Sequence, residues 1–257
     1  MNRKYRKTVI TANWKMHKTA GETRDYLETL KGALPRTKRC SVVICVPYID
    51  IPTAVKVLKD SRIAVGAQNL HWAKEGPYTG EISAGMLAEY GVKYVIVGHS
   101  ERRAMAGETD PEVHRKLRAA LDAGLRPILC VGEDASQRKL GVTQEHITCQ
   151  LKTVLSGVTP EEMRRVVLAY EPIWAMETGR TVAPEEAAQV CADIRSVIRK
   201  LYDARIARST TIQYGGPMDD GNTQALLSQE DVDGGLIGTA SLSVGSFLSI
   251  IRTANQE

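Results

Sequence analysis

The stretch VVLAYEPIWAMETGRTVAPEEAAQVCADIRSVIRKLY (Val166–Tyr202) contains a strand, a loop and a helix in that order, and it decides the fold class. Its opening apolar run is typical of a strand buried on both faces of a parallel sheet. The run ends in a carboxylate, Glu171, and Pro172 stiffens the next step. Pro184–Glu186 then predict the start of a long helix through Tyr202, because proline and acidic residues are favoured in a first helical turn.

Apolar runs of this kind recur along the chain, with helical periodicity between them. The runs are Thr8–Trp14, Ser41–Pro47, Arg62–Asn69, Lys93–Ser100, Arg126–Glu133, Arg165–Pro172, Thr210–Gly216 and Asp233–Ala240. The clearest helical segments are Gly21–Leu34, Ile82–Gly91 and Glu112–Gly124, and Asp110 before Pro111 is predicted to be an N-cap.

Eight strand–helix units leave no room for a linker or a second domain. We therefore predict a single α/β domain over residues 1–257, folded as an eightfold βα barrel, whose usual length is about 250 residues. The alternative is a doubly wound open sheet, which usually carries a glycine-rich phosphate turn after its first strand. Residues 13–17 (NWKMH) do not form such a turn.

Charge and cysteine content narrow the class of protein. The net charge of +4, from 34 basic and 30 acidic side chains, is too small to indicate a nucleic-acid or membrane partner. The apolar stretch near the N-terminus stops at Asn13, too early for a signal peptide, and no segment reaches membrane-spanning length. The five cysteines are widely spaced without a CxxC pair, which favours reduced thiols in a cytoplasmic protein. Cys130 lies in an apolar run and is expected in the core.

Polar residues gather where the predicted strands end. Asn13 and Lys15 follow the first strand, His99 the fourth and Glu171 the sixth, while glycine-bearing turns follow the seventh and eighth. In a βα barrel these ends meet at one mouth. A carboxylate base with a neutral imidazole and an ammonium suits proton transfer between carbons next to a carbonyl, which needs no redox cofactor. The scattered histidines predict no metal site.

A set of motifs, in order along the chain, resembles the triosephosphate isomerase family. They are NWKMH (13–17), AQN (67–69), YTGE (78–81), GHSERR (98–103), GETD (107–110), CVGE (130–133), AYEPIWA (169–175) and YGG (214–216). The match covers residues 8–247. It implies a TIM barrel and a cofactor-free aldose–ketose isomerase of glycolysis and gluconeogenesis, which interconverts dihydroxyacetone phosphate and glyceraldehyde 3-phosphate through an enediolate.

The resemblance also implies a role for each polar residue at the mouth. Glu171 would be the base, His99 the neutral electrophile, Lys15 the fixed positive charge and Asn13 a group that orients the substrate. Glu101 would contact Lys15 and hold its side chain in place.

The remaining implied positions surround the substrate. Cys130 would support the site from the core. The phosphate would lie among Glu177, Gly216, Pro217, Gly238 and Thr239. A lid would follow the hinge at residues 172–174, close over the substrate and exclude water; its residues are Ala175, Met176, Glu177, Thr178 and Gly179. In the family the segment matching His71–Glu81 enters a neighbouring subunit, so the resemblance implies a homodimer with Thr79 at the contact.

Three departures from the family pattern concern the phosphate. Pro217 replaces a serine and so removes one hydroxyl and one backbone N–H. Glu177 adds a carboxylate to the lid, and Thr239 adds a side chain where the family has glycine. These changes leave open two alternatives: an isomerase of another small sugar phosphate, such as a tetrulose phosphate, and a catalytically weak barrel that only binds phosphorylated ligands.

Overall fold

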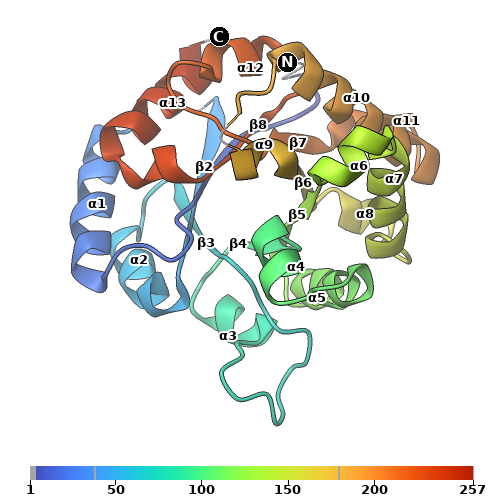
Figure 1. The fold of residues 1–257 in the computed structure, drawn as a ribbon. Helices are drawn as coiled ribbons and strands as arrows, with labels where there is room; N and C mark the ends of the chain where they lie inside the picture. Colours follow the sequence, from blue (N-terminus) through green and yellow to red (C-terminus); the bar gives the residue numbers. More distant parts are fainter. Residues whose placement is uncertain (1–3, 38, 179, 257) are drawn as a thin grey trace.

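The computed structural model describes residues 4–37, 39–178 and 180–256, and its strands close into one parallel barrel in chain order (Figure 1). The strands are β1 (Thr8–Asn13), β2 (Cys40–Val46), β3 (Ile63–Ala67), β4 (Tyr94–Val97), β5 (Arg126–Val131), β6 (Val167–Tyr170), β7 (Thr211–Tyr214) and β8 (Gly234–Ile237). The prediction of an eightfold βα barrel is confirmed. Each strand stops one to three residues before the end of its predicted run, so Lys15, His99 and Glu171 follow the strands, whereas Asn13 is the last residue of β1.

Helices surround the barrel on the outside (Figure 1). They are α1 (Ala20–Ala33), α2 (Ile51–Val57), α3 (Ala84–Glu89), α4 (Ser100–Met105), α5 (Asp110–Asp122), α6 (Ala135–Leu140), α7 (Thr143–Val154), α8 (Pro160–Met163), α9 (Ile173–Thr178), α10 (Pro184–Leu201), α11 (Ala204–Ser209), α12 (Thr223–Ser228) and α13 (Val244–Gln256). Short 3₁₀ turns occur at η1 (Tyr48–Asp50) and η2 (Thr239–Leu242).

One predicted helix start is wrong. The N-cap of α5 is Thr109, one residue before Asp110. The Glu112 carboxylate reaches back and accepts the backbone N–H of Thr109 at 2.9 Å, so this threonine closes the helix end. Asp110 belongs to the helix and accepts a hydrogen bond from Arg103 at 2.5 Å.

Alternation along the strands divides the core in two. Side chains such as Val43 and Cys45 of β2, and Ile128 and Cys130 of β5, point into the barrel and form an inner cluster. Their neighbours pack outward against the helices in a larger cluster. This division follows from the two-residue period of a strand. The inner space also holds Gln213, whose amide donates to Val9 O at 2.9 Å and to Thr11 Oγ1 at 2.8 Å.

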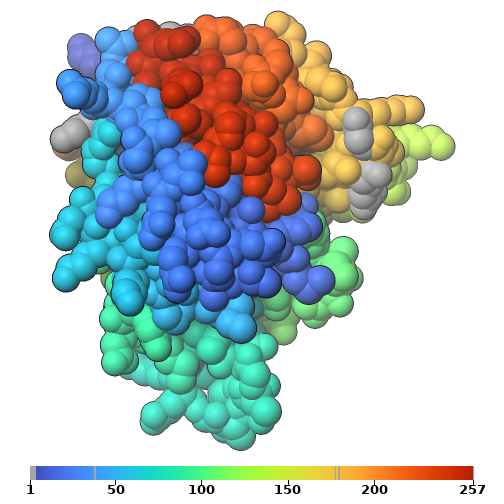
Figure 2. Space-filling view, turned by 90° about the vertical axis from the view of Figure 1, so that its left-hand side faces the viewer, coloured from blue at the N-terminus to red at the C-terminus, as the bar shows by residue number. Residues whose placement is uncertain are grey.

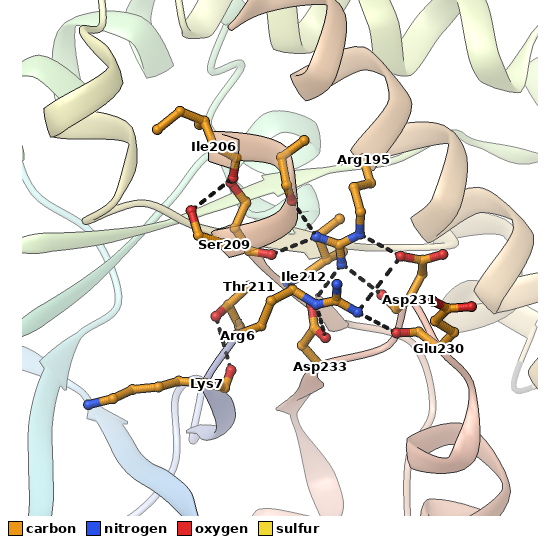
Figure 3. Close-up of polar contacts among 12 residues, drawn as sticks. Arg6, Lys7, Arg195, Ile206, Ser209, Thr211, Ile212, Glu230, Asp231 and Asp233 are labelled. Atoms are coloured by element: carbon orange, nitrogen blue, oxygen red, sulfur yellow. Dashed lines mark hydrogen bonds and ion pairs between the residues drawn. The ribbon is translucent and has the colours of Figure 1, made fainter. Parts of the chain in front are cut away.

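The start of β8 is held by a cluster of charges at the end of the barrel opposite to the polar mouth (Figure 3). Asp233, which is 0% exposed, accepts hydrogen bonds from Arg6 at 2.6 Å and Arg195 at 2.8 Å. Its carboxylate also accepts the backbone N–H of Ile212 at 3.0 Å, and its carbonyl accepts that of Val9 at 3.1 Å. One residue therefore connects β1, β7 and β8 where the barrel closes.

The segment between β3 and α3 projects from the rounded body in both views (Figures 1 and 2). It contains Thr79, which is exposed. The imidazole of His71 stacks on Trp72 and contacts Tyr78, with ring centroids 4.2 and 4.1 Å apart. The projecting loop is thus held in shape by its own aromatic side chains. None of the helices in the described part of the chain has the length and apolar character needed to cross a bilayer.

Candidate active site

The first loop at the barrel mouth brings Asn13 and Lys15 into the site. Asn13 ends β1 with 5% exposure, and its side-chain oxygen accepts the backbone N–H of Lys15 at 3.1 Å. Lys15 has a positive φ of 53°, uncommon for a residue with a side chain. Its carbonyl accepts a hydrogen bond from Gln68 at 2.9 Å. Contacts from β1 and from the end of β3 therefore fix the strained backbone of Lys15.

Lys15 and His99 meet through Glu101. The ammonium of Lys15 donates to Oε1 of Glu101 at 2.5 Å, across 86 residues of sequence. The other carboxylate oxygen lies 3.7 Å from Nδ1 of His99. The Lys15 and Glu101 side chains are 34% and 44% exposed, so this pair borders solvent. The structure thus places the Glu101 carboxylate between Lys15 and His99.

His99 and Glu171 form a buried pair. Nε2 of His99 lies 2.8 Å from Oε1 of Glu171, and Oε2 accepts the backbone N–H of Ser100 at 2.8 Å. Both residues are almost entirely buried, with 5% and 2% exposure. Nδ1 of His99 accepts the backbone N–H of Glu101 at 3.2 Å. Only a ring without a proton on Nδ1 can do this, so the neutral ring carries its proton on Nε2, facing the carboxylate.

Burial and hydrogen bonding shift the pKa values of Glu171 and His99 in opposite directions. Burial raises the pKa of Glu171, but the His99 ring and the Ser100 N–H lower it by more, so it lies below its ordinary value. Burial lowers the pKa of His99, and the Glu171 carboxylate raises it by more. The site therefore favours an ionised carboxylate beside the imidazole.

Gly132 and Cys130 lie next to Glu171. A Cβ on Gly132 would lie 1.8 Å from the carbonyl oxygen of Glu171, so only glycine fits there. Cys130 is 0% exposed in the barrel interior, and burial, with the nearby Glu171 charge, raises its pKa well above the ordinary value. The thiol is therefore un-ionised, which agrees with the prediction of a core residue and not a nucleophile.

A cavity of about 390 Å³ lies beside these groups. Its lining includes Asn13, Lys15 and His99 and the predicted phosphate positions Gly216, Pro217, Gly238 and Thr239. Among the described residues that line it, Lys15 is the one cation and Thr239 the one side-chain hydroxyl. No group of three or more metal-ligating side chains occurs within the described ranges.

The predicted lid begins as a short helix. Ala175, Met176 and Thr178 lie in α9, and Met176 reaches the cavity wall. The Trp174 indole donates to the buried Glu133 carboxylate at 2.9 Å, which anchors the predicted hinge. Gly179 and the side chain of Glu177, which were predicted to belong to the lid and the phosphate site, lie outside the described residues.

The sequence analysis missed several lining residues. Leu236, Met218 and Asp219 face the cavity. Met218 and Asp219 come shortly after the Gly215–Gly216 turn. This position was the sequence signal that could have identified them as lining residues. Leu236 is one of several apolar residues of β8, and nothing in the sequence distinguished it as a lining residue. Thr79 projects in the loop between β3 and α3, outside the cavity lining of its own chain.

Comparisons with known proteins agree with this geometry. The sequence model of the family described as triosephosphate isomerase matches residues 8–254. A triosephosphate isomerase from Acetivibrio thermocellus is 45% identical over 96% of this chain and 98% of its own length. Those from Carboxydothermus hydrogenoformans and Chloroflexus aurantiacus are each 44% identical, over 96% and 95% of this chain and 98% of their own lengths.

Proposed function

The chain belongs to the triosephosphate isomerase family, and we propose that its proton transfers are carried out by Glu171 together with His99, Lys15 and Asn13. It is an enzyme of glycolysis that interconverts dihydroxyacetone phosphate and glyceraldehyde 3-phosphate. The observation that supports the proposed roles is the buried contact of 2.8 Å between Glu171 and His99, because His99 lines a cavity that Lys15 also lines.

The reaction divides between base and electrophiles. The Glu171 carboxylate takes a proton from the carbon next to the substrate carbonyl, and the electron pair moves onto the carbonyl oxygen. With substrate bound, the Nε2–H of His99 leaves the Glu171 carboxylate and, together with the Lys15 ammonium, donates to the developing enediolate oxygen. The hydroxyl proton on the deprotonated carbon's oxygen then passes to the former carbonyl oxygen, and Glu171 returns its proton to the former carbonyl carbon, so a new carbonyl forms, the base is regenerated and no cofactor is consumed. Burial of the pair excludes water that would compete for the proton.

We assign the phosphate to the side of the cavity that is formed by the turns after β7 and β8. Gly216 and Gly238 provide turns whose backbone N–H groups suit an anion, and Lys15 adds the positive charge. Pro217 contributes no N–H. Thr239 lines the same wall with a hydroxyl, and we assign to it the hydrogen bond that a serine at position 217 would make.

A coupled assay on triose and tetrulose phosphates, with the wild type, Glu171→Gln and Lys15→Met, tests these assignments. We expect turnover of glyceraldehyde 3-phosphate by the wild type and its loss in both variants, with folding unchanged by circular dichroism. A variant that retains wild-type turnover would contradict its assigned role. Preference for the tetrulose phosphate would favour the alternative isomerase, and binding without turnover would favour the weak barrel.

We also propose that the enzyme works as a homodimer in the cytoplasm. Next to Lys15 lies a second hollow of about 440 Å³, lined by Tyr48, Met16 and Met105. The two methionines are 93% and 87% exposed, an unusual state for large apolar side chains. We assign this hollow to the projecting loop with Thr79 of a second copy. The cytoplasmic assignment is supported by the five cysteines, all without disulfide bonds.

Analytical ultracentrifugation tests the dimer. Met105→Glu places a charge in the hollow, and Thr79→Arg enlarges the loop that would enter it. We expect the wild type to sediment as a dimer and both variants to shift toward monomer with lower activity, because Lys15 borders the hollow. Leu140→Glu changes a side chain of α6 that is 72% exposed and should leave the mass unchanged. A monomeric wild type with full activity would contradict the proposal.

A further inference from the structure

We propose that Lys18 is a positioning residue that connects the loop bearing Lys15 to the β8 turn at the phosphate side of the cavity. The inference rests on the proposed function, because it assumes that these two segments bind the substrate. Lys18 lies in the loop between β1 and α1, three residues after Lys15. Lys18 is not among the residues that line the cavity, so it acts through other residues.

The ammonium of Lys18 has three contacts. It donates to the carbonyl of Leu242, at the end of η2, at 3.1 Å. It also lies 5.3 Å from the ring centroid of Trp14 and 4.7 Å from that of Tyr26. The two rings meet edge to face, with centroids 4.9 Å apart. A cation over two aromatic rings that also donates to a carbonyl is held in one place.

The same contacts lead to the substrate cavity. Tyr26 donates its hydroxyl to the carbonyl of Ser241 at 2.6 Å, and the Ser241 hydroxyl donates to the carbonyl of Gly238 at 2.6 Å. Gly238 lies against Lys15, since a Cβ built on it would be 3.5 Å from Cε of that lysine. Lys18 and Tyr26 thus hold η2 against the β1 loop, and this fixes the distance between the Lys15 charge and the Gly238 turn.

The backbone gives an independent reason to look at Lys18. Its φ is +74°, and among the described residues only Lys15, Lys18 and Asp60 have positive φ without being glycine. Glycine would adopt this conformation without strain, so the backbone alone favours glycine at position 18. A lysine is found there instead, and its side-chain contacts are the compensation that the structure provides. A glycine at position 18 would relieve the backbone strain but remove the side-chain contacts. Replacing Lys18 by glycine therefore distinguishes a role of this lysine in stability from a role in positioning.

The test compares Lys18→Gly and Lys18→Met with the wild type. Measurements are kcat, the KM for glyceraldehyde 3-phosphate, the inhibition constant of inorganic phosphate and the unfolding temperature. We expect KM and the phosphate inhibition constant to rise together by about tenfold, or about 1.4 kcal/mol. The unfolding temperature of Lys18→Gly should stay close to that of the wild type, because glycine removes the backbone strain together with the side-chain contacts that compensate for it. Lys18→Arg should restore most of the affinity.

Two controls keep the outcomes distinct. Lys31→Met removes another lysine that donates to carbonyls, Val57 O and Lys59 O, on the outside of α1, and should change neither constant. Unchanged KM and phosphate inhibition in both Lys18 variants would overturn the proposal, as would a lower unfolding temperature with unchanged constants. Absence of triose phosphate turnover in the wild type would instead contradict the proposed function, while phosphate binding to Lys18→Gly could still be compared directly.

Discussion

At the scale of single residues, the feature that matters most is an ionised carboxylate held almost out of water. Glu171 is 2% exposed, yet its pKa lies below the ordinary value because His99 and the Ser100 N–H stabilise the charge. The carboxylate contacts His99, which lines the cavity, whereas Glu171 itself is not among the lining residues. To take a proton the carboxylate has to leave the His99 ring, so its effectiveness depends on the exact length of the side chain.

Shortening this side chain should therefore affect chemistry more than binding. Glu171→Asp withdraws the carboxylate by one methylene, and we expect kcat to fall by about a hundredfold while KM changes little. Steady-state kinetics on glyceraldehyde 3-phosphate would measure both. Equal losses in kcat and in substrate affinity would show that Glu171 binds the substrate and does not act as the base.

At the scale of elements, three helices begin at a threonine whose capping box closes the first turn. Thr19, Thr109 and Thr159 cap α1, α5 and α8, and in each case a glutamate three residues later reaches back to the cap. In α8 this glutamate, Glu162, also accepts a hydrogen bond from Arg118 of α5 at 2.8 Å. One carboxylate therefore closes a helix end and joins two neighbouring helices.

This double role gives a pH dependence with a definite sign. The Arg118 hydrogen bond, followed by the Thr159 N–H, lowers the pKa of Glu162 from 4.5 to about 2. A carboxyl with a lowered folded pKa stabilises the protein above pH 4.5 and loses this contribution as the pH falls toward 2. We expect Glu162→Gln to cost about 0.5–1 kcal/mol at pH 7 in urea denaturation, and progressively less below pH 4.5. Glu161→Gln, in the same exposed turn, is the control; equal costs at all pH values would contradict this account.

At the scale of the whole molecule, barrel closure depends on few backbone pairs at β8. The register pairs β1 with β8 at four positions, but β7 with β8 only at Tyr214 and Gly235. Asp233 reinforces this seam, since it bonds the backbone of Ile212 and Val9 and receives both Arg6 and Arg195 (Figure 3). Its charge is buried, so each partner is needed to keep it compensated.

Removing one partner should weaken the whole barrel. Arg195→Met leaves the buried Asp233 carboxylate half paired, and we expect the free energy of unfolding to fall by about 3–5 kcal/mol in guanidinium denaturation. Arg199→Met, one turn later on the exposed side of α10, should cost far less. Similar stabilities for the two variants would show that the cluster in Figure 3 adds nothing to closure.

Local patterns allowed much of this molecule to be predicted. The apolar run before Glu171 and the helix from Pro184 follow from the two-residue and 3.6-residue periods of strand and helix, which depend only on nearby residues. Parallel strands in order then bring their C-terminal ends together, so Asn13, Lys15 and His99 could be expected at one mouth. The N-cap at Thr109 was missed because Asp110 and Thr109 carry equally good local signals.

The sequence by itself determined the order of elements, the fold class and the set of side chains at the mouth. The family resemblance implied that Glu101 contacts Lys15, but only the tertiary structure showed the contacts of Glu171 with His99 and of Lys18 with the carbonyl of Leu242. The partners of Lys15 and Lys18 lie 86 and 224 residues away. Periodicity and capping extend over a few residues, whereas a contact of about 3 Å is fixed by packing of the entire barrel.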